Sequence, residues 1–365
     1  MIPVYEPSLD GNEFKYVTEC LKTNWISSKG KFSNLLCKKF SEYTNINHVT
    51  NVSNGTCALS LALATLNIPK DSEVLIPSFG YVAVAASVVR HGAIPVFVDI
   101  DLEDLQIDVA DLERKINNNT SAIIGIHNYG YPYRSKIVNQ IAKNYGIFHI
   151  EDCAEAVGTK NYDGIHVGNE SDISTFSLYA NKTITAGEGG LLCSNSKDLI
   201  DIANNLKNHA IAEPGVYDHN DFGFNFRMTN IASAIALAQL ENIESKLSRK
   251  KEIAKKYKEG IKSSRFKLFD PNPELNLNSF WMNTLLTKSP NESEILIRHL
   301  KNNNIETRPL FKPVHLMKPY KNFSDKKLIS SEKIHGCGLN LPSFPSLKNE
   351  QIKIIIKVIN DSPDN

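Results

Sequence analysis

The sequence predicts an α/β fold in which helices cover a mainly parallel sheet. Between residues 50 and 195, short apolar segments alternate with helical ones, as in a sheet whose strands are joined by crossover helices. Several apolar segments are continuous runs, which indicates strands that are buried on both faces. The expected strands are residues 73–77, 94–100, 121–126, 146–152, 172–177 and 189–195.

The helical segments complete this pattern and suggest a second unit. Residues 56–66 and 135–146 predict helices between the strands. Residues 228–261 predict one long helix that is apolar in its first half and charged in its second. Such a change indicates a helix that leaves one core and bridges to another. We therefore predict a large domain over residues 1–245 and a smaller C-terminal α/β domain over residues 246–365.

Bulk composition excludes several classes of protein. The chain has 365 residues, 41% of them hydrophobic, and a formal net charge of +1, so it has no electrostatic basis for binding nucleic acid or an anionic membrane. No apolar run approaches the ~18 residues of a membrane span, and the first residues lack the pattern of a signal peptide. Six scattered cysteines without a CxxC pair indicate reduced thiols. We expect a soluble, cytoplasmic protein without a metal site.

Residues 53–56, with the sequence SNGT, directly precede the apolar helix 56–66. The first backbone N–H groups of a helix have no partner inside it and bind phosphate well. Gly55 would let a ligand approach the backbone, and Thr56 would add a hydroxyl. The alternative is an ordinary N-terminal cap, and this motif alone favours the cap.

Asp152 ends the apolar strand 146–152, at the sheet edge where open α/β folds bind ligands. A buried carboxylate needs a cationic partner there, and a protonated pyridine nitrogen is one candidate. Many strands also end in Asp simply to cap the next helix. The motif is therefore suggestive only.

Lys182 follows the strand 172–177 and precedes a glycine-rich turn at residues 187–190. A lysine in a crowded turn can become nucleophilic through partial burial and neighbouring cations, as a Schiff base requires. Most lysines, in contrast, lie on solvated faces.

Seven segments in order resemble the DegT/StrS family of sugar-nucleotide aminotransferases, over about residues 2–358. They are SNGT, PSFGYVA, EDCAEA, STFSLYANKTITAGEGG, GFNFRMTNIASAIALAQL, IETRPLFKPVH and GLNLPSFPSL. The resemblance implies the aspartate aminotransferase-like fold, fold type I, with pyridoxal 5'-phosphate (PLP) as cofactor. It also implies an enzyme rather than a binding protein.

The resemblance implies a role for each matching residue near the cofactor ring. Lys182 matches the lysine that binds the cofactor aldehyde and later carries the proton. Asp152 matches the acid that pairs with the pyridine nitrogen, Glu155 lies near the ring hydroxyl, and Tyr81 matches an aromatic that stacks on the ring.

The resemblance also implies phosphate and substrate contacts. Gly55, Thr56 and Ser177 match phosphate contacts of the same chain. Asn225 and Arg227 match contacts from a neighbouring subunit, so a homodimer with shared sites is expected. For the substrate, the family match indicates Arg308 and His315, although an Arg-Pro turn and a structural histidine explain these two residues equally well.

The expected reaction transfers an amino group from L-glutamate to C4 of a 4-keto-6-deoxyhexose linked to GDP, UDP or dTDP, giving a perosamine- or viosamine-type product. Departures from the family pattern, such as Gly80, Asn128, Tyr131 and Val157, leave the exact sugar open.

Four alternatives to this reaction remain. They are 3-amination, a PLP-dependent sugar dehydratase on the same scaffold, a catalytically silent regulatory homologue and a nicotinamide enzyme. Lys182 disfavours the dehydratase, in which a histidine replaces it. The retention of Lys182, Asp152 and Ser177 disfavours the silent homologue, and the lack of GxGxxG after the first strand disfavours the nicotinamide enzyme.

Overall fold

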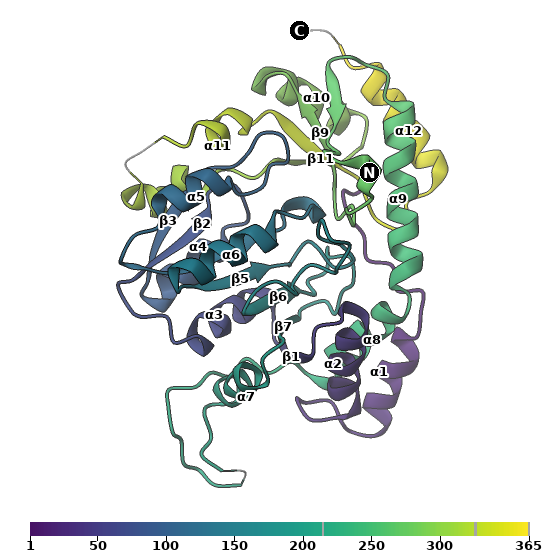
Figure 1. Ribbon diagram of the computed structural model, residues 1–365. Helices are drawn as coiled ribbons and strands as arrows, with labels where there is room; N and C mark the ends of the chain where they lie inside the picture. Colours follow the sequence, from purple (N-terminus) through teal and green to yellow (C-terminus); the bar gives the residue numbers. More distant parts are fainter. Residues whose placement is uncertain (214, 325–326, 364–365) are drawn as a thin grey trace.

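The computed structural model describes residues 1–213, 215–324 and 327–363. Its central sheet has seven strands in the order β1-β7-β6-β5-β4-β2-β3 (Figure 1). The strands are β1 (His48–Val52), β2 (Glu73–Pro77), β3 (Ile94–Val98), β4 (Thr120–Ile126), β5 (Phe148–Asp152), β6 (Ile173–Ser177) and β7 (Gly190–Ser194). β7 runs antiparallel to both its neighbours, and the pairings from β6 to β3 are all parallel. The predicted α/β fold with a mainly parallel sheet is confirmed.

Helices cover both faces of this sheet, which explains the continuous apolar strands. One face packs against α3 (Gly55–Thr65), α4 (Ala83–His91) and α7 (Lys197–Leu206). The other face packs against α5 (Val109–Lys115) and α6 (Ser135–Tyr145) at one end, and against α2 (Lys31–Thr44) at the other. Every residue of β6 and β7 is buried, as expected for strands between two helical layers.

Strand β1 is the one central strand that the sequence analysis missed. Its polar residues interrupt the apolar pattern, but Thr50 and Asn51 each have a specific partner. Thr50 donates a hydrogen bond to Asn204 (2.6 Å), and the amide of Asn51 donates to the Ser33 hydroxyl (2.8 Å). Because these partners come from distant elements, no local pattern shows the strand.

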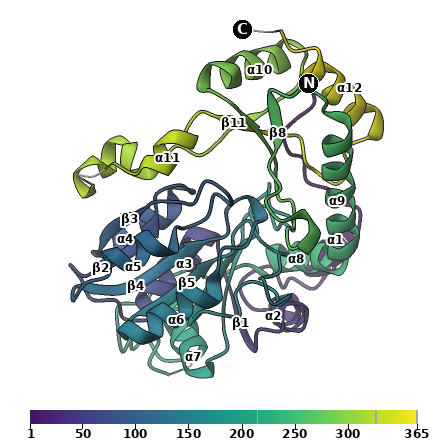
Figure 2. The same ribbon diagram turned by 45° about the horizontal axis from the view of Figure 1, so that its top comes forward.

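The predicted long helix over residues 228–261 is two helices. These are α8 (Asn230–Glu241), which packs against α1 (Glu13–Lys22) and α2, and α9 (Ile243–Gly260). Between them Asn242 leaves helical geometry, with φ −105° and ψ 14°. Asparagine disfavours helix interiors because its side chain competes for backbone hydrogen bonds. Figure 2 shows α9 running from α8 toward the C-terminal helix α12 (Asn349–Asn360).

A second, four-stranded antiparallel sheet has the order β10-β11-β9-β8. Its strands are β8 (Phe266–Leu268), β9 (Asn283–Thr287), β10 (Arg308–Pro309) and β11 (Gly338–Leu341). Other elements of this part are α10 (Pro290–Asn302), α11 (Ile329–Ile334), η2 (Pro273–Leu275), η3 (Val314–Leu316) and η4 (Lys318–Phe323).

The N-terminal residues lie against this second sheet's unit. Ile2 donates its N–H to the Asn304 carbonyl (2.7 Å), and Val4 donates to the Glu306 carboxylate (3.0 Å). The division of the chain near residue 245 stays a prediction, and these contacts show that the start of the chain packs with the C-terminal part. None of the helices in the described ranges is both long and apolar enough to cross a bilayer.

Candidate active site

The predicted cofactor residues meet at one edge of the central sheet. β5 ends at Asp152 and β6 ends at Ser177, and because the two strands are parallel, both residues lie at the same edge. β7 runs the opposite way, so its first residue, Gly190, pairs with Ser177 at this edge. Open α/β sheets bind ligands at the carboxyl ends of their strands.

The N-terminus of α3 packs tightly against this edge. A Cβ atom on Gly55 would lie 2.9 Å from Cβ of Ser177, and one on Gly190 would lie 2.6 Å from the carbonyl carbon of Asn54. The Asn54 side chain caps the helix by accepting from the N–H of Cys57 (2.8 Å). The two interpretations of the SNGT motif, a phosphate site and an ordinary N-terminal cap, are compatible, because the capped start of α3 lies beside the Ser177 side chain. Such a helix start favours an anionic group.

Lys182 is held from three sides. Its amine lies 3.5 Å from a carboxylate oxygen of Glu155 and 4.1 Å from the ring centre of Trp281. Its main-chain carbonyl accepts a hydrogen bond from the hydroxyl of Tyr5 (2.6 Å). The side chain is only 13% exposed. Lys182 is therefore an ordered, largely buried lysine and not a solvated one.

Two buried carboxyls lie close to this amine. Burial raises the pKa of Glu155 to about 7, although Lys182 and the N–H of Tyr129 act in the opposite direction. Burial also raises the pKa of Asp152, opposed by the N–H of Ala154 and by Lys182. A raised pKa means that the carboxylate lacks enough positive charge around it. A protonated pyridine nitrogen would supply that charge to Asp152, so the PLP ring fits this site.

Glu151, the residue before Asp152, is part of a buried hydrogen-bond network. Burial opposes ionisation of Glu151, yet its bond with His127 (2.9 Å) and the N–H of Gly168 (3.0 Å) lower its pKa to about 2. His127, Glu151 and Cys153 place potential ligand atoms within 4.8 Å of one another. We assign no metal to this group, because the Glu151 carboxylate also accepts from the N–H of Glu170 (3.1 Å).

Tyr81 follows β2 at the same edge of the sheet. The side chain is 59% exposed, and its ring centre lies 6.1 Å from that of Phe311. An exposed aromatic at this position could cover one face of a bound ring. The stacking role of Tyr81 stays a prediction.

Asn225 and Arg227 lie in the segment between α7 and α8, away from Lys182 along the chain. The Phe226 carbonyl accepts from the N–H of Ser53 (2.8 Å), so this segment runs beside the start of α3. The Arg227 guanidinium donates to the side chains of Asn225 (3.0 Å) and Asn208 (2.8 Å). Arg227 thus orients Asn225 within its own chain, and the predicted contact with a neighbouring subunit stays untested.

The two predicted substrate residues have different surroundings. Arg308 is exposed in β10 and forms an ion pair with Glu306 (2.7 Å). His315 is buried, and its two ring nitrogens lie 2.5 Å from the Ser78 hydroxyl and 3.4 Å from the Glu332 carboxylate. These contacts are those expected of a structural histidine. A substrate role for either residue stays a prediction.

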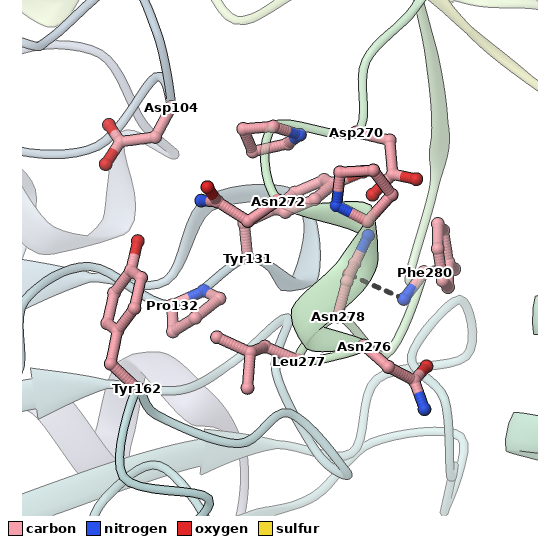
Figure 3. Close-up of a pocket in the computed structure, with 12 residues that line it drawn as sticks. Asp104, Tyr131, Pro132, Tyr162, Asp270, Asn272, Asn276, Leu277, Asn278 and Phe280 are labelled. Atoms are coloured by element: carbon pink, nitrogen blue, oxygen red, sulfur yellow. Dashed lines mark hydrogen bonds between the residues drawn. The ribbon is translucent and has the colours of Figure 1, made fainter.

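A separate pocket lies between the loop after β8 and the segment after η1 (Asn128–Gly130), as Figure 3 shows. Its polar lining includes Asp104, Tyr162 and Asp270. None of the predicted cofactor residues lines this pocket.

Sequence reasoning missed Trp281 and Tyr5, the two aromatic residues that contact Lys182. The indole N–H of Trp281 also donates to the Asn181 carbonyl (2.8 Å). Only two tryptophans occur in the chain, and Trp281 lies in the segment NSFWMN directly after the Pro/Asn-rich patch. That rarity was the only available signal, and nothing local connects either residue with position 182.

Comparison with known proteins decides the family. The family model described as the DegT/DnrJ/EryC1/StrS aminotransferase family matches residues 7–360. The chain belongs to this family. It is therefore a PLP-dependent sugar aminotransferase, and the predicted cofactor and enzyme class are confirmed.

Relatives whose names state a function cover almost the whole chain. The GDP-perosamine synthase of Escherichia coli O157:H7 is 46% identical over 99% of this chain and 98% of its own length. The GDP-perosamine synthase of Vibrio cholerae is 40% identical, with 98% of both chains covered. The crystal structure of the aminotransferase TlmJ from Streptoalloteichus hindustanus superposes with a TM-score of 0.94 at 25% identity, covering 99% of this chain and 98% of that one. These family members confirm the predicted fold type.

Proposed function

We propose that this enzyme transfers an amino group from L-glutamate to C4 of a GDP-linked 4-keto-6-deoxyhexose. The observation that carries the chemistry is Lys182, whose buried amine lies 3.5 Å from Glu155 at the sheet edge that also holds Asp152. The names of the relatives support GDP and a perosamine-type product. A viosamine-type product from a UDP- or dTDP-linked sugar is the second candidate.

Different residues of the chain would bind the ring, the phosphate and the aldehyde of the cofactor. Bound PLP supplies the electron sink on which amino transfer depends. Asp152 would hold positive charge at the ring nitrogen, and the start of α3 with Ser177 would hold the phosphate. Lys182 would bind the cofactor aldehyde and then carry a proton to or from the reacting carbon, with Glu155 close enough to stabilise the ammonium form.

The direct test offers L-glutamate together with each keto-sugar nucleotide in turn and follows release of 2-oxoglutarate. We expect turnover with the GDP-linked 4-keto-6-deoxymannose and ping-pong kinetics, with at least about tenfold lower kcat/KM for UDP- and dTDP-linked sugars. Loss of a water molecule from the sugar without 2-oxoglutarate release would instead indicate a dehydratase. Product with nitrogen at C3 would contradict the proposed position.

We also propose that the enzyme works as a homodimer whose sites are shared. The segment between α7 and α8 projects from the rest of the chain (Figure 1), and on it Tyr217 and Phe222 are almost fully exposed. Large exposed aromatic side chains favour burial against a partner, here a second copy. A reducing compartment such as the cytoplasm suits the six free cysteines, all of which lie in the described ranges.

Subunit mixing tests the shared site. Lys182→Ala and Asn225→Ala chains are each expected to be impaired, but a mixed dimer would contain one site with both residues intact. After exchange of equal amounts, we expect activity to rise toward about a quarter of the wild-type value, measured at limiting PLP. Equal mixing of Lys182→Ala with the double variant is the control, because no intact site can form. If subunits exchange but the mixture is no more active than the two variants measured separately, a shared site is contradicted.

A further inference from the structure

Lys250 is a fully buried lysine that the proposed chemistry does not use. It lies in α9 with 0% exposure. Its amine donates to the main-chain carbonyls of Ser343 (2.8 Å) and Trp281 (3.1 Å), and the Phe280 carbonyl lies at 3.4 Å. Among the described residues, no carboxylate forms an ion pair with it. Burying an ammonium group without a carboxylate is costly, and an apolar side chain would fill the space more cheaply.

Two of the three carbonyls around the Lys250 amine, those of Phe280 and Trp281, belong to the turn that carries Trp281, and the third, that of Ser343, lies just after β11. Phe280 has a φ of +51°, a left-handed conformation that side-chain-bearing residues rarely adopt. Its N–H donates to the Asn278 side chain (2.7 Å), which Figure 3 shows from the side of the separate pocket. The buried Lys250 amine binds the same turn through the carbonyls of Phe280 and Trp281. An otherwise unfavourable turn is thus held by two polar side chains.

Two contact paths lead from Lys250 to Lys182. The first runs through Trp281, whose ring centre lies 4.1 Å from the Lys182 amine and whose indole N–H binds the Asn181 carbonyl (2.8 Å). The second runs through Tyr5, whose ring centre lies 5.2 Å from the Lys250 amine and whose hydroxyl binds the Lys182 carbonyl (2.6 Å). The paths reach both the amine and the backbone of Lys182.

We propose that Lys250 is a positioning residue for Lys182. Its ammonium group holds the turn at residues 280–281, so that the indole of Trp281 lies against the Lys182 amine and limits where that amine can go. Burial and, to a smaller extent, Lys246 lower the pKa of Lys250 to about 7, while the carbonyl oxygens around it favour the charged form. The inference rests on the role of Lys182 proposed above.

Lys250→Met tests the proposal, because methionine keeps much of the length and removes the charge and donors. Lys246→Met is the matched control: Lys246 is also buried in α9, but its amine binds the Ser8 carbonyl (3.0 Å) and not the turn. We expect Lys250→Met to lower kcat about ten- to a hundredfold, with KM for both substrates changed less than about threefold. Borohydride trapping of PLP on Lys182 should slow in parallel. Lys246→Met should change neither.

Tryptophan fluorescence gives a readout that does not depend on the cofactor. The chain has only Trp25 and Trp281, so a Trp25→Phe background isolates Trp281. In the cofactor-free protein, we expect Lys250→Met to shift its emission to longer wavelength and to increase quenching by acrylamide, because the ring leaves its packed position. Unchanged emission and quenching would overturn the proposal, and so would equal effects of Lys246→Met.

The experiments distinguish failure of the cofactor role proposed for Lys182 from failure of the positioning role proposed for Lys250. If Lys182 were not the cofactor lysine, trapping would label another residue while the Trp281 signal still responded to Lys250→Met. If only the positioning role were wrong, trapping would label Lys182 normally in every variant. Should Lys250→Met not fold, Lys250→Gln retains a shorter donor, and its fluorescence and kcat are expected to change in the same direction by a smaller amount. Wild-type values for both in Lys250→Gln would then overturn the proposal.

Discussion

Replacement of Lys182 by alanine is expected to lower kcat by about 10⁴-fold or more, because the amine both binds the cofactor covalently and carries the proton. Among the described lysines, Lys182 is the one whose amine forms an ion pair with Glu155 and lies over the ring of Trp281. The measurement is release of 2-oxoglutarate at saturating PLP. Treatment of the wild type with borohydride, followed by peptide mapping, should place the cofactor on the peptide that contains residue 182.

A matched control and a rescue experiment sharpen this expectation. Lys197→Ala removes an exposed lysine that pairs with the neighbouring Asp201 on α7, and it should retain wild-type activity. Small primary amines added to Lys182→Ala should restore part of the rate, since they can replace the missing proton carrier. A Lys182→Ala enzyme whose kcat stayed within about tenfold of wild type would remove the assignment.

Asp152→Asn is expected to lower kcat by about 10²- to 10⁴-fold while the protein stays folded. The change keeps the size of the side chain, but it removes the charge that would keep the ring nitrogen protonated. The Ala154 N–H, which now donates to the Asp152 carboxylate (3.0 Å), can still donate to the amide oxygen. Kinetics at saturating PLP and titration of cofactor binding would separate the loss of rate from a loss of affinity.

The same substitution should stabilise the cofactor-free protein. Burial raises the folded-state pKa of Asp152 above its value in the unfolded chain. At pH values between these two pKa values, the folded protein therefore binds more protons than the unfolded chain. The wild type therefore loses stability as the pH rises through the range between these two pKa values, and above that range it retains the full cost of the buried charge. Urea unfolding at pH 7 should show Asp152→Asn to be more stable than wild type. A less stable, equally active variant would contradict both the burial argument and the proposed role.

Most strands of the central sheet could be predicted because the apolar runs that indicate them are local in the sequence. Buried parallel strands are continuous apolar runs, and the strands containing Asp152 and Ser177 were found in this way, with end points within about two residues. β1 was missed because Thr50 and Asn51 are polar, and their partners, Asn204 and Ser33, lie far away in the sequence. The helix break at Asn242 was missed because a single asparagine changes helical periodicity very little.

The site itself divides in the same way. Asp152 and Ser177 end strands, Lys182 follows one, and Gly55 begins a helix, so short motifs are enough to place them near the sheet edge. The predicted substrate role of His315 rests on family resemblance alone. In the folded chain its ring nitrogens face Ser78 and Glu332, neighbours that no motif reveals.

From its amino-acid order alone, this chain could be assigned an α/β fold, because the period of its apolar residues is a local signal. The order of seven family-like segments then indicated the fold type and the cofactor, and it predicts Lys182 as the lysine that binds that cofactor. Only the folded chain shows what surrounds that lysine. Tyr5, Lys250 and Trp281 come from the N-terminal segment, α9 and the turn before β9. Their contacts with one another and with Lys182 span separations of about 30 to 245 residues, and contacts over such distances leave no periodic trace in a sequence.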